Sequence, residues 1–417
     1  MQLKTILNRV QKYKSFVYGK VNWLDTGGVP EFEVEIKARA NSQPVCSHCG
    51  CKASGYDRLP SRRFEFIPMW GIKVFLRYSP RRVNCHRCGI HVETMPWSKG
   101  KYQLTESYAW FLSGWAKRLS WKEVAEVFHT SWDHVFSSVE MAVDWGKKHR
   151  DLSAIKAIGV DEIQWQRGHK YLTLVYQIDS DCRRLLWVGQ HRTVKTLLRF
   201  FREFGKERSE ALEHVCSDMW KPYLKVIRKK AMNALHILDR FHIMVHLSKA
   251  VDKVRAQETK TLKEKGLEPV LTRSRWLLLK RPENLNDKQE SKLAELVQYN
   301  LKAIRCYLLK EEFQLFWEYV SPYWAGRFLD KWCTKVMRSK IEPMKEVAKM
   351  LRRHESLLMN WFKAKGQFSS GIVEGFNNKA KLTTRKAYGF RTFYAAQIAL
   401  YHTLGALPVP ETTHKFF

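Results

Sequence analysis

Residues 157–162 read AIGVDE, an apolar run that ends in two acidic residues. Short apolar runs of this kind are typical of strands that are buried on both faces of a sheet. Four similar runs follow, KYLTLVYQI, RLLWVGQ, EHVCS and ALHIL, and amphipathic stretches at 194–204 and 220–230 separate the last three. The pattern predicts an α/β sheet whose elements follow the order β-β-β-α-β-α-β.

Acidic residues follow three of these runs. Asp161 ends the first run, Asp218 comes directly after the fourth, and Asp239 comes after the last. In a sheet of this order the first and fourth strands can lie side by side and parallel, so Asp161 and Asp218 are expected to be neighbours at one end. Glu162 is expected to face away from Asp161, because successive strand residues point to opposite faces.

A third carboxylate is expected from Glu374, in the helical stretch GIVEGFNNKAK at 371–381. One face of that helix would carry Glu374, Asn377, Asn378 and Lys381. Neighbouring carboxylates repel unless a cation lies between them, and Mg²⁺ or Mn²⁺ takes oxygen ligands. Asp161, Asp218 and Glu374 are therefore the candidate catalytic and magnesium-binding residues. Aspartates at strand ends also cap helices or form ion pairs, and that alternative stays open here.

The composition indicates a polyanionic partner. The chain has 417 residues, of which 45% are hydrophobic, and its 73 Lys and Arg exceed its 41 Asp and Glu by 32. Such a surplus is typical of proteins that bind nucleic acid. No stretch approaches 18 uninterrupted apolar residues, and the first 16 residues lack an apolar signal region, so neither a membrane span nor secretion is expected.

The cysteines predict a structural zinc site. Five of the nine lie between Cys46 and Cys88, and four of these form two C-x-x-C pairs: Cys46, Cys49, Cys85 and Cys88. Two such pairs can supply four thiolates to one tetrahedral Zn²⁺. The alternating stretch between them, RRFEFIPMWGIKVFLRY, indicates a hairpin, and together these features suggest a zinc ribbon. Free thiols or a redox C-x-x-C are the alternatives.

Residues 105–146 have the pattern of three helices. Ser120-Trp-Lys-Glu123 is a capping box that would begin the second helix, and Ser131 can cap a longer third helix. A short helix, a tight turn and a longer helix match a DNA-reading helix-turn-helix, with Trp132 and His134 at its exposed end. An ordinary three-helix bundle would have the same pattern.

Basic residues cluster after the second acid and around the Glu374 helix. The candidate DNA-binding residues there are Lys225, Arg228, Lys229, Lys379, Lys381, Arg385, Lys386 and Arg391. Lys and Arg neutralise phosphates and release counterions, so together these residues favour a DNA channel. Trp276 is a candidate for stacking on a splayed base, although a place in the core is the preferred interpretation.

These motifs together resemble a known family, the DDE transposases of the bacterial ISL-three insertion sequences, over essentially the whole chain. The resemblance rests on the two cysteine pairs, the helix-turn-helix and four motifs. The motifs are Ile158-Gly-Val-Asp161-Glu162, Ser217-Asp218-Met-Trp-Lys-Pro-Tyr223, Asp239-Arg-Phe-His242 and Gly371-Ile-Val-Glu374-Gly-Phe-Asn-Asn-Lys379. Asp239 and His242 resemble a C/D-x-x-H motif whose role, structural or catalytic, stays open.

The resemblance implies an α+β multidomain fold with an RNase H-like core. The expected domains are a zinc ribbon (1–98), a helix-turn-helix (99–150), the first part of the core (151–242), an all-helical insertion (243–366) and the last part of the core (367–417), which carries the Glu helix.

The resemblance also implies a function. A transposase would bind the terminal inverted repeats of its element and use Mg²⁺ to cut a DNA strand and join it to target DNA. It would act as a homodimer or larger assembly on double-stranded DNA in the bacterial cytoplasm, with no membrane partner. A DNA-binding regulator with an inactive core and a structure-specific nuclease are the alternatives.

Overall fold

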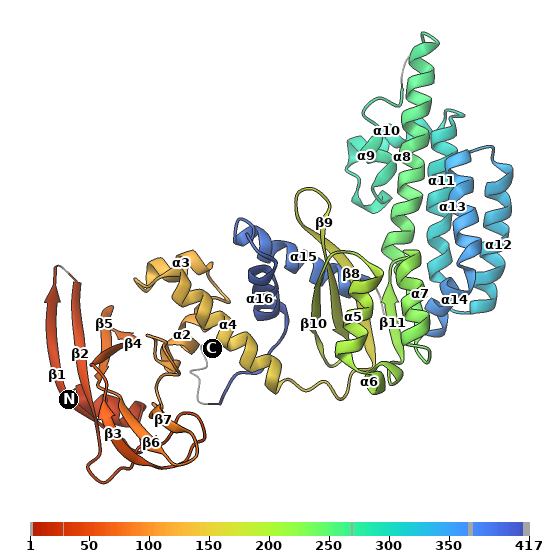
Figure 1. Cartoon of the computed structure of the whole chain (residues 1–417). Coiled ribbons are helices and arrows are strands. Elements are labelled where there is room, and N and C mark those ends of the chain that lie inside the picture. The colour runs from red at the N-terminus through yellow and green to blue at the C-terminus, as the bar shows by residue number, and fades with distance from the viewer. Residues whose placement is uncertain (1–2, 28, 268–269, 366–369, 412–417) are drawn as a thin grey trace. The chain divides into compact units, whose positions relative to one another are not determined.

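The computed structural model of the chain describes residues 3–27, 29–267, 270–365 and 370–411 (Figure 1). The chain divides into two compact units. The first comprises Met1–Arg150 and Arg385–Phe417, and the second comprises Asp151–Thr384.

The N-terminal part of the first unit contains two small sheets. One has the strand order β1-β2-β5-β4 and the other β3-β6-β7. The elements are α1 (Leu3–Val10), β1 (Phe16–Thr26), β2 (Val29–Ala38), β3 (Ser54–Arg58), β4 (Arg62–Met69), β5 (Ile72–Tyr78), β6 (Arg81–Cys85) and β7 (Gly89–Val92). Trp97 is almost fully buried in the core of the larger sheet and contacts the rings of Phe16 and Tyr78 edge-on.

The expected hairpin between the cysteine pairs is present as antiparallel β4 and β5. It does not belong to the cysteine-bearing sheet, however. It pairs with β2 in the larger sheet, whereas Cys85 and Cys88 lie at the end of β6 and in the turn before β7 of the smaller sheet. The sequence pattern does not indicate the long strand β1, whose buried side chains include Phe16 and Tyr18.

The three helices expected in residues 105–146 are confirmed. They are α2 (Glu106–Trp115), α3 (Trp121–Val127) and α4 (Trp132–His149). The Ser120–Glu123 capping box begins α3, and the hydroxyl of Ser131 accepts from the backbone N–H of His134 to cap α4. Helix α16 (Phe393–Leu404) packs against α4, so the C-terminal segment belongs to this unit.

The second unit contains the sheet that the apolar runs predict. Its strand order is β10-β9-β8-β11-β12. The strands are β8 (Ala157–Gln166), β9 (Lys170–Ile178), β10 (Arg183–Gln190), β11 (His214–Ser217) and β12 (Leu235–Leu238). β8 pairs antiparallel with β9 and parallel with β11, as expected for the first and fourth strands.

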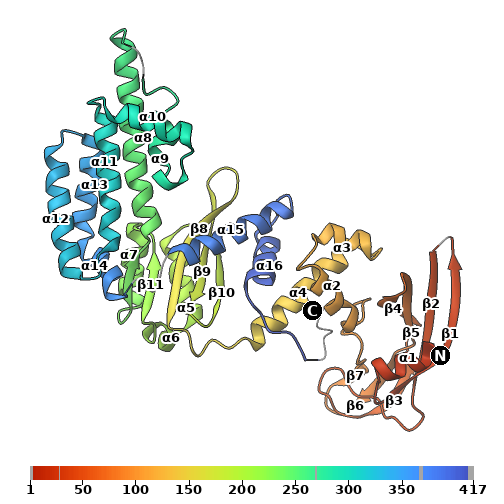
Figure 2. The same cartoon turned by 180° about the vertical axis from the view of Figure 1, so that it is seen from behind.

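Helices cover both faces of this sheet. One face packs against α5 (Val194–Phe204) and α7 (Lys221–Lys230), and α6 (Lys206–Glu210) lies between them in the chain. α15 (Ser370–Lys386) lies over the other face (Figures 1 and 2). There Val373 sits above Gly159.

A helical region follows β12 and is built around the long helix α8 (Figure 2). Its elements are α8 (Arg240–Glu264), α9 (Arg275–Leu279), η1 (Pro282–Asn284), α10 (Asp287–Val297), α11 (Lys302–Gln314), η2 (Leu315–Glu318), α12 (Pro322–Arg338), α13 (Glu342–Arg353) and α14 (Glu355–Lys363). In the described part of the chain, no helix is both long enough and apolar enough to cross a membrane.

Two expectations need correction. Trp276 is not a core residue: 61% of it is exposed, because α9 buries Leu277 and Leu278 instead. The segment 367–417 is divided between the units at Arg385, within α15, because α16 packs on α4.

Gly159 provides a test of how α15 is seated. A Cβ at this position would lie 2.5 Å from Cγ2 of Val373. Gly159→Val should therefore displace α15 and lower the free energy of unfolding by about 1–3 kcal/mol, measured by denaturant titration.

Gly375→Ala is the matched control on the same helix. A Cβ there meets nothing within 4 Å, so the variant should be neutral or about 0.5–1 kcal/mol more stable. Equal stability of Gly159→Val and the parent chain would contradict the seating of α15 on β8.

Candidate active site and metal centre

Three acidic residues follow the same register position of three parallel strands. Val160 pairs with Ser217, and Ser217 pairs with Leu238. The next residue of each strand segment is an aspartate, namely Asp161, Asp218 and Asp239. Paired parallel strands lie about 4.8 Å apart, so the backbone brings these aspartates into one row at the edge where β11 and β12 end.

Asp161 lies on the face of the sheet that α15 covers. Its Oδ2 accepts a hydrogen bond of 2.5 Å from Nδ2 of Asn377, and the hydroxyl of Tyr176 donates to Oδ1 of Asn377 over 2.9 Å. Ligand atoms of Asp161, Asp239 and His242 all lie within 4.8 Å of one another. Oxygen and imidazole donors thus converge beside Asp161.

Asp218 has different partners. Its Oδ1 accepts from the backbone N–H of Trp220, and its Oδ2 accepts from Nη2 of Arg192 over 2.8 Å. Nε of Arg192 lies 2.7 Å from Oε1 of Glu162, which points away from Asp161 as expected. The aspartates are neighbours along the sheet edge, but their carboxylates belong to two different clusters.

Burial shapes the acidity of this site. It raises the pKa of Asp161 above its usual range, and it raises the pKa of Glu162, which the nearby Asp218 carboxylate raises further. Perturbed pKa values of this kind are common at functional sites. Since burial penalises an uncompensated carboxylate, the site favours a cation beside these acids.

Glu374 lies on α15, one turn before Asn377. Val373 sits above Gly159, and Phe376 stacks on Tyr176 at 4.9 Å. Among the residues that the structure describes, the half-buried carboxylate of Glu374 forms no ion pair or hydrogen bond.

The cysteine cluster is compact. Four sulfur atoms all lie within 4.8 Å of one another, those of Cys46, Cys49, Cys85 and Cys88. A glycine of positive φ follows each pair, Gly50 at 71° and Gly89 at 80°. It turns the chain tightly after the second cysteine. A tetrahedral zinc with bonds of about 2.3 Å requires sulfurs about 3.8 Å apart. The cluster is therefore suited to hold a zinc ion.

Comparison with known proteins identifies the family. A family model described as a transposase, that of the DDE transposases of the ISL-three (ISL3) group, matches residues 158–400, which is more than half of the chain. The chain belongs to this family.

Curated relatives extend the similarity beyond the matched region. The chain is 26% identical to the transposase for insertion sequence element IS1001 of Bordetella parapertussis, over 93% of this chain and 95% of that protein. It is 28% identical to the transposase for insertion sequence element IS1557 of Mycobacterium tuberculosis, over 88% of this chain and 87% of that protein. The resemblance inferred from the motifs is confirmed.

Trp132 lies at the start of α4 in this transposase and is 45% exposed. Its ring stacks on Phe136 at 5.3 Å and contacts Trp121, which also contacts Phe390. These aromatic residues join the start of α4 to the segment that precedes α16.

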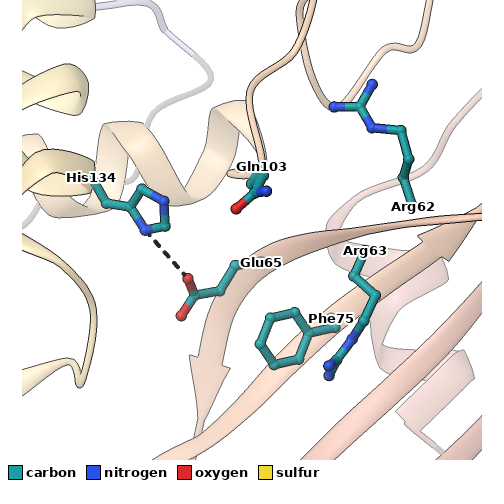
Figure 3. A pocket seen from close by; sticks show the side chains of 6 residues that line it. All are labelled: Arg62, Arg63, Glu65, Phe75, Gln103 and His134. Carbon is teal, nitrogen blue, oxygen red and sulfur yellow. Dashed lines mark ion pairs between the residues drawn. The ribbon is translucent and has the colours of Figure 1, made fainter.

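The imidazole of His134 points toward Glu65 of β4. It lines a cavity of about 410 Å³ together with Arg62, Arg63, Glu65, Phe75 and Gln103 (Figure 3). Its Nδ1 lies 3.8 Å from Oε2 of Glu65 and 3.0 Å from the hydroxyl of Thr130. Burial lowers the pKa of His134 and raises that of Glu65, so both groups tend toward their neutral forms. The imidazole helps to join α4 to the larger sheet.

The basic candidates are exposed. Those on α7 are Lys225, Arg228 and Lys229, and those on α15 and the segment after it are Lys379, Lys381, Arg385, Lys386 and Arg391. Lys386 also donates to the backbone carbonyl of Arg118 within the first unit. Exposed cations of this kind suit contacts with phosphates.

The sequence does not predict the position of Arg192 between two acids. Arg192 follows β10 through His191, whose φ is 72°, and lies between two acids distant in sequence. A single arginine in a short connection carries no local signal. Only the pairing of β8 with β11 shows which acids it meets.

The cysteine cluster gives a direct test. Replacing Cys46 and Cys49 by Ser removes two of four thiolates, so the purified protein should lose one equivalent of zinc and unfold at lower temperature, as measured by metal analysis and thermal melting. Cys51→Ser is the control, because Cys51 lies outside the group of four, and it should keep its zinc. Full zinc content in the double variant would refute the assignment.

Proposed function

We propose that this transposase cuts DNA at the ends of an insertion sequence and joins them to target DNA, with Asp161, Asp218 and Glu374 as its metal-binding catalytic residues. The single observation that carries the proposal is the parallel register of β8 and β11, in which Val160 pairs with Ser217 and each is followed by an aspartate, Asp161 or Asp218. The order β10-β9-β8-β11-β12 supports an RNase H-like core.

The orientation of α15 supports the proposed role of Glu374 as a metal ligand. Val373 sits above Gly159 and Asn377 above Asp161, so the helix follows β8. The spacings agree, because four helical residues advance about 6 Å and two strand residues about 6.6 Å. Phe376 meets Tyr176 of β9. On a helix oriented in this way, we expect Glu374 on the flank opposite to Phe376, toward β11.

The donors at this edge suit a hard divalent cation. Carboxylate oxygens, which Asp161, Asp218 and Glu374 would each supply, are the ligands that Mg²⁺ and Mn²⁺ prefer. When bound, such ions polarise the scissile phosphate and lower the pKa of the attacking water.

The chain's own residues position these ligands. Asn377 donates to Asp161 and is itself held by Tyr176, so one carboxylate oxygen has a fixed direction. Asp239 caps α8 through the backbone N–H of Phe241, and its second oxygen lies toward His242. We infer a positioning role for these last two residues beside Asp161.

The first unit would recognise the element ends. The cysteine sheet would act as a zinc ribbon, and α3 and α4 as a helix-turn-helix with Trp132 at the groove. Two ends must be joined, so a dimer or larger assembly on double-stranded DNA is proposed. Membership of a transposase family does not favour a regulator with an inactive core or a structure-specific nuclease.

Asp161→Asn and Glu374→Gln test the catalytic assignment. Each variant should bind a labelled element end as well as the parent chain does, and its Mg²⁺-dependent cleavage should fall by roughly 10³-fold or more, since ligand geometry at the metal is lost. Gel separation of cut and uncut strands measures this.

Glu213→Gln is the matched control. Glu213 directly precedes β11, at the end of the strand opposite to Asp218, and pairs with Lys156 at the surface. This variant should cleave normally. Cleavage at the parent rate by Asp161→Asn would overturn the triad.

Lys379 and Lys381 test the proposed contact with DNA. Replacing both by Gln should weaken end binding similarly for all sequences and reduce the slope of log affinity against log salt by about 2, one unit for each lost phosphate contact. Lys260→Gln, at an exposed position on α8, should leave the slope unchanged. An unchanged slope in the double variant would remove these lysines from the interface.

A further inference from the structure

Arg192 occupies an unusual position for a basic residue in a protein rich in exposed cations. Its guanidinium bridges two acids of different strands, with Nε 2.7 Å from Oε1 of Glu162 and Nη2 2.8 Å from Oδ2 of Asp218. It also lies over the indole of Trp220, 4.5 Å from the ring centroid. A planar fork with several donors is suited to such a bridge.

The two acids need a cation for a physical reason. The side chain of Glu162 is only 7% exposed and that of Asp218 only 15%. Carboxylates this close and this buried repel each other and lose hydration, so a positive charge between them stabilises both. In the described chain, Arg192 supplies that charge at the carboxylate that the proposed function gives to a metal ion.

We infer that Arg192 is a built-in counter-ion that competes with the divalent metal for Asp218. The inference rests on the proposed function, since it requires Asp218 to be a metal ligand. Metal binding exchanges the Arg192–Asp218 bond for a metal–Asp218 bond and leaves Arg192 paired with Glu162.

The surroundings favour release at Asp218 rather than at Glu162. Asp218 keeps the backbone N–H of Trp220 as a partner and is the more exposed of the two acids. Arg192 is itself 32% exposed, so its freed Nη2 can turn toward solvent and a phosphate of bound DNA. His191 before it, at φ 72°, and Thr193 after it, the N-cap of α5, hold the backbone of Arg192 in place.

The test measures metal affinity and stability, separately from cleavage. Binding of Mn²⁺ to the full-length protein is followed by the loss of the free-ion EPR signal, and thermal melting is recorded with and without Mn²⁺. Mn²⁺ prefers oxygen ligands, so the cysteine cluster contributes little to the signal. Arg192→Gln should bind Mn²⁺ about tenfold more tightly than the parent chain, because the competing cation is gone.

Stability separates this role from a purely structural one. Without metal, Arg192→Gln should melt several degrees below the parent chain, and Mn²⁺ should restore most of that loss, because the ion takes over the charge of the guanidinium. Arg192→Lys keeps a charge that reaches only one acid. Its Mn²⁺ affinity should therefore lie between those of the parent chain and Arg192→Gln. Arg199→Gln, which removes an exposed cation of α5, should match the parent chain.

Two results would overturn the inference: unchanged Mn²⁺ affinity in both Arg192 variants, or a loss of stability that Mn²⁺ does not restore. If Arg192→Gln does not fold, the Mn²⁺ affinity and thermal stability of Arg192→Lys alone test the inference. Failure of the proposed function is recognised separately. In that case Asp218→Asn would bind Mn²⁺ like the parent chain, or the parent chain would not cut element ends in Mg²⁺.

Discussion

The parallel pairing of β8 with β11 and of β11 with β12 is the constraint on which the site depends. Parallel strands in register end at a common level, so residues that follow the last paired positions are brought together however far apart they lie in the chain. Here those residues are Asp161, Asp218 and Asp239. The row of acids is thus a consequence of backbone hydrogen bonding, with side chains adjusting only the last few ångströms.

Charge compensation divides that row into two clusters. Asp161 meets the amide of Asn377 and lies near Asp239 and His242, whereas Asp218 meets Arg192 and through it Glu162. Both arrangements satisfy buried acids that would otherwise be costly. They also bear on the proposed function, in which these internal partners are exchanged for metal ions. The internal partners on the Asp218 side carry a full positive charge, while Asn377 on the Asp161 side is neutral.

The position of Glu374 depends on the packing of α15 against the sheet rather than on strand pairing. α15 rests on β8 because Gly159 has no side chain and leaves room for Val373, while Phe376 and Asn377 lock onto Tyr176. The long helical region between β12 and α15 has its own core and separates Glu374 from the strands in sequence only. After α15 the chain contributes α16 to the first unit, where it packs on α4.

The sequence by itself determined the elements whose signals are local. Apolar runs marked β8 to β12 because strands buried on both faces are mostly apolar. The capping box at Ser120 marked the start of α3, and the paired cysteines marked a cluster that can hold a metal ion. Tertiary structure alone decided which sheet the β4–β5 hairpin joins, that Trp276 is exposed, that His134 turns to Glu65, and that Arg192 bridges two acids. These outcomes depend on contacts between residues distant in the chain, for which neither periodicity nor motif spacing carries information.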